Sequence, residues 1–176
     1  MDPIEPADGS DFSPFGGSLE AECSLLFNDC QDNGTAGVSQ STVWTQDSSR
    51  GLVRVDTEGV GTTTWAQAPS GCPGFSGNRT IKAYNRVWFL FEVEGEVSFH
   101  LTGTLTGAEH APLGFRFVDV TDRPTFDILE SRYINVRTSI SIDESGVLGP
   151  GEYYFNLTAD ASGNSTLSHD LVLVFE

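Results

Sequence analysis

Three side chains between positions 86 and 105 have the chemistry of a carbohydrate-binding surface. Trp88, Glu92 and His100 occupy even positions of a segment whose odd positions are apolar. Successive side chains of a strand point to opposite faces, so we expect all three on one outward face. An indole ring stacks on the apolar face of a sugar, while polar groups bond its hydroxyls. The pattern predicts a ligand-binding platform, and a loop packed over Trp88 is the structural alternative.

Three glutamates, Glu92, Glu94 and Glu96, cluster around one turn. Glycosidases use a carboxyl pair in which the surroundings keep one member protonated. At an exposed turn all three groups stay solvated, and they protect a sheet edge from pairing. The chain also has no Gly-x-Ser-x-Gly motif for a nucleophilic serine. We therefore expect no catalytic residues and no enzyme, with a polysaccharide hydrolase or lyase as the alternative.

Acidic loops make Ca²⁺ the cofactor that the sequence favours. This ion takes oxygen ligands from carboxylates and loop carbonyls. The metal candidates are Asp119 and Asp122, and the loops at 28–33 and 143–144 are further candidates. None of these loops matches the EF-hand pattern. The pair at 119 and 122 fits an ordinary Asx turn equally well, so both interpretations stay open.

The three cysteines predict one disulfide and one free thiol in an oxidising compartment. We favour a bond between Cys23 and Cys30, which would close a small loop, although Cys72 could replace either partner. Neither their spacing nor any nearby histidine supports a zinc site.

Two further motifs bear on burial and modification. His169 lies in the apolar odd row of the last segment, so we expect a core histidine rather than a ligand. Asn-x-Ser/Thr sequons occur at Asn33, Asn78, Asn156 and Asn164, and the outward position of Asn156 is compatible with a glycan.

The charge balance excludes whole classes of partner. Aspartate and glutamate number 25 against nine lysines and arginines, which gives a net charge of −16. Phosphate backbones and anionic lipid surfaces repel such a chain, so we expect no nucleic acid and no membrane insertion. The acidic composition favours solubility in an extracellular medium.

The elements that position these residues are predicted to be strands. Residues 86–105, RVWFLFEVEGEVSFHLTGTL, alternate on both sides of a three-residue turn at 94–96. This predicts a hairpin in which Val93 pairs with Val97 and the odd side chains share one buried face. In this pairing Leu90 lies opposite His100.

The whole chain predicts an all-β fold, an antiparallel β-sandwich with jelly-roll-like order and about ten short strands. No helical period of useful length occurs. Residues 1–18 are expected to form a flexible acidic N-terminal lead, and residues 19–176 a single domain that starts with a loop-rich stretch at 19–42. The last strand, 166–175, becomes apolar on both faces and should be central.

Two stretches, 101–105 (LTGTL) and 148–153 (LGPGEY), resemble the β-sandwich ectodomains of bacterial exported surface proteins, many of which carry a PEP-CTERM sorting tail. The resemblance covers roughly residues 80–176 and rests on strand and turn signals. It implies secretion and a role at the cell surface or matrix, and it transfers no catalytic residue.

These observations predict a secreted, non-enzymatic β-sandwich with a structural or adhesive role at the cell surface or extracellular matrix. The alternative is a carbohydrate-binding module for an extracellular polysaccharide. We expect a signal peptide to have been removed from the mature chain. The partners would be a polysaccharide or a surface protein, and the N-terminal segment could form a homo-oligomer by strand exchange.

Overall fold

The computed structural model describes residues 15–27, 30–48, 51–66, 82–107, 113–121, 126–134, 138–162 and 164–176. Within these ranges the chain forms strands and no helix, so no helix capable of crossing a membrane occurs there. The ten strands are β1 (Phe15–Phe27), β2 (Cys30–Asp47), β3 (Gly51–Ala66), β4 (Lys82–Val93), β5 (Val97–Thr106), β6 (Leu113–Asp119), β7 (Phe126–Ile134), β8 (Ser139–Leu148), β9 (Gly151–Ser162) and β10 (Ser165–Phe175).

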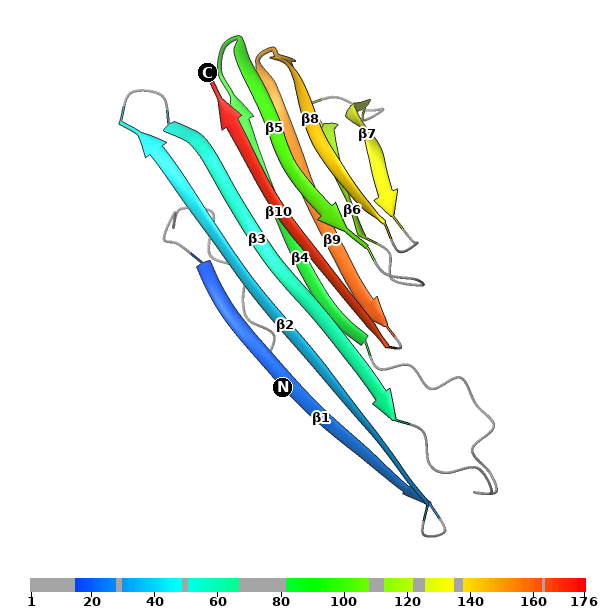
Figure 1. Ribbon diagram of the computed structural model, residues 1–176. Coiled ribbons are helices and arrows are strands. Elements are labelled where there is room, and N and C mark those ends of the chain that lie inside the picture. The colour runs from blue at the N-terminus through cyan, green and yellow to red at the C-terminus, as the bar shows by residue number, and fades with distance from the viewer. Residues whose placement is uncertain are drawn as a thin grey trace.

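Two antiparallel sheets form the two layers of the molecule (Figure 1). The six-stranded sheet has the order β1-β2-β3-β10-β5-β8, and the four-stranded sheet has the order β4-β9-β6-β7. The prediction of an all-β, antiparallel two-layer fold is confirmed. The strands are longer than expected, with 18 residues in β2 and 16 in β3. The finer jelly-roll order stays a prediction, because the sheet orders do not establish it.

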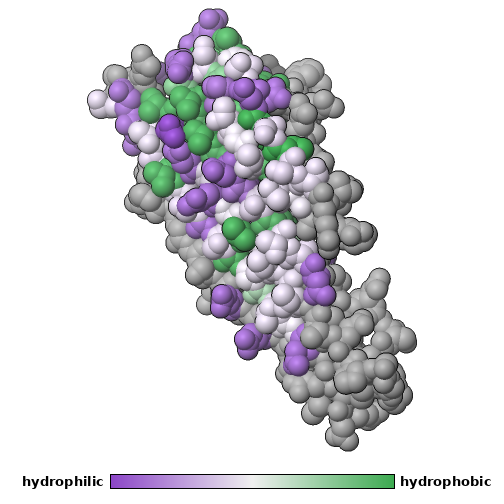
Figure 2. Space-filling view, in the orientation of Figure 1, coloured by the Kyte–Doolittle hydropathy of each residue, from purple (hydrophilic) through white to green (hydrophobic). Residues whose placement is uncertain are grey.

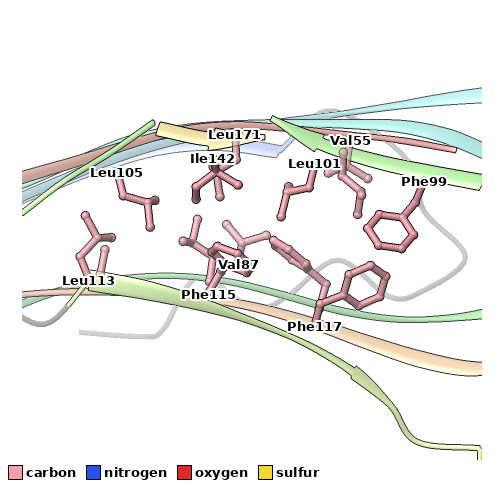
Figure 3. Close-up of a cluster of buried hydrophobic side chains, with 14 of the residues drawn as sticks. Val55, Val87, Phe99, Leu101, Leu105, Leu113, Phe115, Phe117, Ile142 and Leu171 are labelled. Carbon is pink, nitrogen blue, oxygen red and sulfur yellow. The ribbon is translucent and has the colours of Figure 1, made fainter. Parts of the chain in front are cut away.

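The core lies between the two sheets, where side chains from both layers point toward one another (Figure 3). Leu101, Leu105 and Phe117 are completely buried. Phe117 packs edge-to-face against Phe99, with ring centroids 5.2 Å apart, and so joins the two layers. Burying a side chain of this size stabilises the fold by roughly 1.5–3 kcal/mol.

The segment at 86–105 does not form the predicted hairpin. β4 pairs with β9 in the four-stranded sheet, whereas β5 pairs with β10 and β8 in the six-stranded sheet. The exposed residues 94–96 therefore connect one layer to the other as an arch. The odd apolar residues do face the core, as predicted, but they face it from opposite sides. Alternation of side chains specifies which face is buried and leaves the partner strand undetermined.

The N-terminal part of the described chain is more regular than expected. β1 begins at Phe15, inside the predicted lead, and the described residues of the stretch at 19–42 belong to β1 and β2 rather than to loops. Residues 1–14, which include most of the segment proposed for strand exchange, lie outside the described residues. At the other end, β10 lies between β3 and β5, so the predicted central position of the last strand is confirmed.

A small polar cluster lies inside the core near Gly59. Asn85 Nδ2 donates to the carbonyl of Ser39 at 3.0 Å, and His169 Nε2 lies 3.4 Å from Thr57 Oγ1. A Cβ at position 59 would lie 2.9 Å from the Ser39 carbonyl and would collide with Asn85 and His169. Glycine at this position therefore makes room for the cluster. Burial lowers the pKa of His169 from 6.5 to about 4, consistent with the expected core histidine.

Candidate functional site

The three residues of the predicted platform lie on two sides of the molecule. Trp88 and Glu92 are on the outward side of β4, four residues apart. His100 is on the outward side of β5, in the other sheet, because its neighbours Phe99 and Leu101 point into the core. The predicted grouping of Trp88, Glu92 and His100 is therefore wrong, since it depended on the hairpin.

His100 has a different partner. Its Nε2 lies 2.6 Å from Asp143 Oδ1 on the neighbouring strand β8. Both side chains are largely exposed, at 51% and 81%, so solvent screens their interaction.

Trp88 lies instead among large side chains of its own sheet. Its indole ring is 6.5 Å from the ring of Tyr154 on β9, at an interplanar angle of 42°. Trp88 is 57% exposed, Leu90 58% and Tyr84 50%. We call this surface the aromatic face, and it comprises Tyr84, Arg86, Trp88, Leu90, Arg116, Tyr154, Asn156 and Thr158.

Alternation along β4 and β9 explains why these residues share the aromatic face. On β4 the even positions 84–90 point outward, while Val87 and Ala83 are buried. On β9, Phe155 and Leu157 are buried, which turns Tyr154 and Asn156 outward. The register sets Leu90 beside Tyr154 and Trp88 beside Asn156.

Polar groups surround the rings of the aromatic face. Asn156 lies between Trp88 of β4 and Arg116 of β6 in the strand register. Thr158 Oγ1 donates to Asn156 Oδ1 at 3.3 Å. An amide and a hydroxyl are hydrogen-bonding partners for sugar hydroxyls, and the amide of Asn156 is on the residue opposite Trp88 in the strand register.

Arg86 lies between Tyr84 and Trp88 on the outward side of β4. Its guanidinium carbon lies 5.1 Å from the Tyr84 ring centroid, within the range of a cation–π contact. Its Nη2 atom is 3.5 Å from Asp160 Oδ2, a long contact for an ion pair, and 56% of the Arg86 side chain remains exposed. Two contacts thus orient the guanidinium while leaving it accessible.

The outward side of the six-stranded sheet has a different composition (Figure 2). Seen from this side, polar and weakly polar residues cover most of the surface, and hydrophobic residues form separate groups. We call this surface the hydroxyl face after its outward serines and threonines, Thr35, Thr62, Thr64, Thr102, Thr104, Thr106, Ser139, Ser141, Thr166 and Ser168.

In the described part of the chain, the side chain of Asp119 stabilises a turn. Its Oδ1 atom accepts the backbone N–H of Thr121 at 2.9 Å, which is the Asx turn considered above. Thr121 in turn receives the N–H of Glu152 at 2.8 Å and so ties this turn to the start of β9. Burial, with the Asp119 charge as a second cause, raises the pKa of the neighbouring Tyr153.

The described residues at this turn supply too few ligands for the predicted Ca²⁺ site. Asp122 lies outside the described residues, so the pair contributes one described carboxylate, whereas Ca²⁺ takes six to eight oxygens. Across the described ranges, no three His, Cys, Asp or Glu side chains group as metal ligands. The cofactor stays a prediction.

The backbone register does not support the predicted disulfide. Cys23 is opposite Gly34 and Cys30 is opposite Phe27, which separates the cysteines by four positions along the ladder. At about 3.4 Å per residue this is roughly 13 Å, whereas a disulfide joins Cα atoms within roughly 7 Å. Cys72 lies outside the described residues.

Sequence reasoning did not combine Trp88 with its actual neighbours. Tyr154 and Asn156 share the even, outward row of the strand at 151–162, and that parity was readable. Arg116 also had a signal, because it interrupts the apolar run Phe115–Phe117. The pairing of β4 with β9, more than 60 residues away, had no local signal.

No protein-family model matches this chain, and no curated protein matches it significantly. Among solved structures, the enzymatically active domain of bacteriophage CBA120 tailspike protein 4 is 11% identical, with a TM-score of 0.29 over 90% of this chain. Infectious bursal disease virus structures of the Gx and Gt strains are 9% and 11% identical, with TM-scores of 0.30 and 0.29 over 98% and 91% of this chain. This chain spans 19% of the tailspike chain and 54% and 56% of the viral chains. Similarity this low carries no functional argument.

Proposed function

We propose that this β-sandwich is a secreted, non-enzymatic adhesion domain that binds an extracellular polysaccharide through the aromatic face. The observation that carries the proposal is Trp88, a residue that is 57% exposed and whose ring lies 6.5 Å from that of Tyr154. An exposed ring on a sheet offers a flat, rigid surface, and it loses little conformational entropy on binding.

The neighbours of Trp88 favour a sugar over a purely apolar ligand. Asn156 lies opposite Trp88 in the strand register, and Arg86 and Thr158 form the next outward pair of the same two strands. A sugar ring presents an apolar C–H face bordered by hydroxyls, so stacking and hydrogen bonding are satisfied together.

A polysaccharide panel tests this proposal directly. Neutral and acidic polysaccharides are screened for retardation of the protein in affinity electrophoresis, after intact-mass measurement shows that Asn156 carries no glycan. We expect Trp88→Ala to weaken binding by about thirtyfold or more, the size of a central aromatic contact.

Val147→Ala is the matched control. Val147 is 60% exposed on β8, in the other sheet, so its truncation removes an equally exposed side chain away from the aromatic face. Binding should stay within twofold of the original protein. Retardation by no polysaccharide, or equal losses in the two variants, would rule out the aromatic face as the binding surface.

A further inference from the structure

Exposure on the outward side of the four-stranded sheet decreases from β4 toward β6. In one row across the sheet, Leu90 of β4 is 58% exposed, Tyr154 of β9 is partly buried, and Val118 of β6 is only 3% exposed. On β6, Gly114 is buried as well, and Arg116 between them is exposed. The surface that is open to a large ligand therefore follows β4 rather than crossing the sheet.

The apolar part of the aromatic face forms a row along β4. Tyr84, Trp88 and Leu90 point outward, and each of them exposes half of its surface or more. From the first to the last of these residues the strand advances by about 20 Å. This length exceeds that of one sugar ring, so the row can contact several consecutive units of a polymer.

The charges around this row are balanced. On the outward side of β4, β9 and β6, the structure describes three cations and three carboxylates, Lys82, Arg86, Arg116, Glu92, Glu152 and Asp160. Arg86, two residues before Trp88, has Asp160 at 3.5 Å. A charged ligand of either sign would therefore meet repulsion as well as attraction. The net charge of −16 adds a long-range repulsion of polyanions.

We infer that the ligand of the aromatic face is an uncharged polysaccharide that lies lengthwise along β4, over Tyr84, Trp88 and Leu90. This inference rests on the proposed function and specifies the class and the direction of its ligand. The apolar faces of successive sugars would pack on the row, and Asn156 and Thr158 of β9 would hydrogen-bond their hydroxyls. Such contacts include no ion pair, so dissolved salt should hardly weaken them.

The ligand class is tested with polymers that share a backbone and differ in charge. Binding of the full chain to immobilised hydroxyethyl cellulose, dextran and glycol chitin is compared with binding to their charged counterparts, carboxymethyl cellulose, dextran sulfate and glycol chitosan. Only binding that Trp88→Ala removes is counted, which excludes ion exchange elsewhere on the chain. We expect a neutral polymer to bind at least about tenfold more tightly than its counterpart. Raising the salt from about 50 to about 500 mM should change this binding by less than about twofold.

The direction of the polymer is tested with substitutions along and across the strands. Tyr84→Ala should weaken binding to the neutral polymer by about five- to tenfold, because it removes the ring at one end of the row. Arg116→Gln, across the sheet from Trp88, should cause a smaller loss. Oligosaccharides of the same polymer should bind more tightly with each added unit until they span the row of about 20 Å.

Val43→Ala is the matched control for Tyr84→Ala. Val43 is exposed on β2, in the other sheet, so its truncation should leave binding to the neutral polymer within about twofold. Thermal unfolding of both variants should match that of the original protein, because both residues are exposed.

The outcomes separate this inference from the proposed function. Trp88-dependent binding that favours a charged polymer, or that weakens more than about tenfold as the salt is raised, would overturn the uncharged ligand and leave polysaccharide binding in place. A larger loss from Arg116→Gln than from Tyr84→Ala, or no gain beyond a disaccharide, would overturn the lengthwise direction. Binding to no polymer, or an absence of any effect of Trp88→Ala, would instead remove the proposed function itself.

Discussion

The aromatic face and the hydroxyl face lie on opposite sides of one core, and their outward side chains differ in chemistry and in the contacts that they make. On the hydroxyl face, side chains pair across neighbouring strands, as in Thr35 with Thr64 at 2.6 Å and Thr106 with Ser139 at 3.2 Å. On the aromatic face, Trp88 and Leu90 keep more than half of their surface in water. The inward residues of the two sheets form the core. The outward residues of the two sheets can therefore differ in whether they bind a ligand or contact one another.

The largest expected change in stability comes from a substitution in the core. It tests whether the two sheets are stabilised by one shared core. Phe117 is fully buried and contacts rings from both layers. Phe117→Ala should lower the free energy of unfolding by about 3–5 kcal/mol, because it leaves a cavity. Urea denaturation measures this change. A loss below about 1 kcal/mol would show that the sheets are stabilised separately and would break the comparison.

The next effect concerns the polar cluster beneath the hydroxyl face. His169 has a folded pKa of about 4, below the ordinary 6.5 of an unfolded chain. As the pH falls below 6.5, His169 binds a proton in the unfolded chain but stays neutral in the folded protein. The free energy of unfolding is therefore constant with respect to this group above pH 6.5, and it decreases as the pH falls toward 4. From pH 7.5 to 5.0 the loss should be about 2 kcal/mol.

Urea denaturation at both pH values measures this contribution, with His169→Gln as the variant that lacks it. The stability difference between the original protein and His169→Gln should shrink by about 2 kcal/mol at pH 5.0. A difference between the original protein and His169→Gln that does not change with pH would show that water reaches His169.

A smaller effect tests whether Trp88 belongs to a binding surface or packs against the rest of the protein. Replacing Trp88 and Leu90 together by threonine gives β4 the outward chemistry of the hydroxyl face. Because both side chains are exposed and threonine suits strands, the free energy of unfolding should change by less than about 1 kcal/mol. Polysaccharide binding should be lost. Thermal and urea unfolding that show a loss above about 2 kcal/mol would mean that Trp88 is a packing residue.

The smallest effect concerns the exposed pair on the hydroxyl face. Asp143→Asn removes the charge that His100 contacts at 2.6 Å. Since both side chains are exposed, we expect a stability change below about 0.5 kcal/mol, and polysaccharide binding should stay the same. Denaturation and binding measurements on one variant check both points. A clear loss of binding would extend the ligand surface to the second sheet.

The sequence predicted which side of each strand faces the core, because side-chain alternation has a local cause. Val87, Phe99 and Leu101 were assigned to the interior and are buried there. It failed on which strands pair, because β4 and β5 have compatible alternation and a short turn between them. Pairing with β9 depends on contacts that only the folded chain makes.

The candidate site shows the same division. Trp88 was predicted to point outward and it does so, because this prediction required only β4, while its role in binding stays a prediction. Its partner His100 was wrong because that assignment required the hairpin, while Tyr154 and Arg116 come from two other strands. The Asp119 turn was one of two readings of a local motif, and the observed Thr121 bond supports the structural one.

The position of β4 has a consequence for how many copies act together. β4 is the outermost strand of its sheet, so the aromatic face reaches the side of the domain rather than ending in a closed pocket. A polymer bound there can continue past one domain onto the next. Several copies of the domain held close together would then bind the same polysaccharide chain. Their spacing would set the avidity, which would exceed the affinity of each single copy.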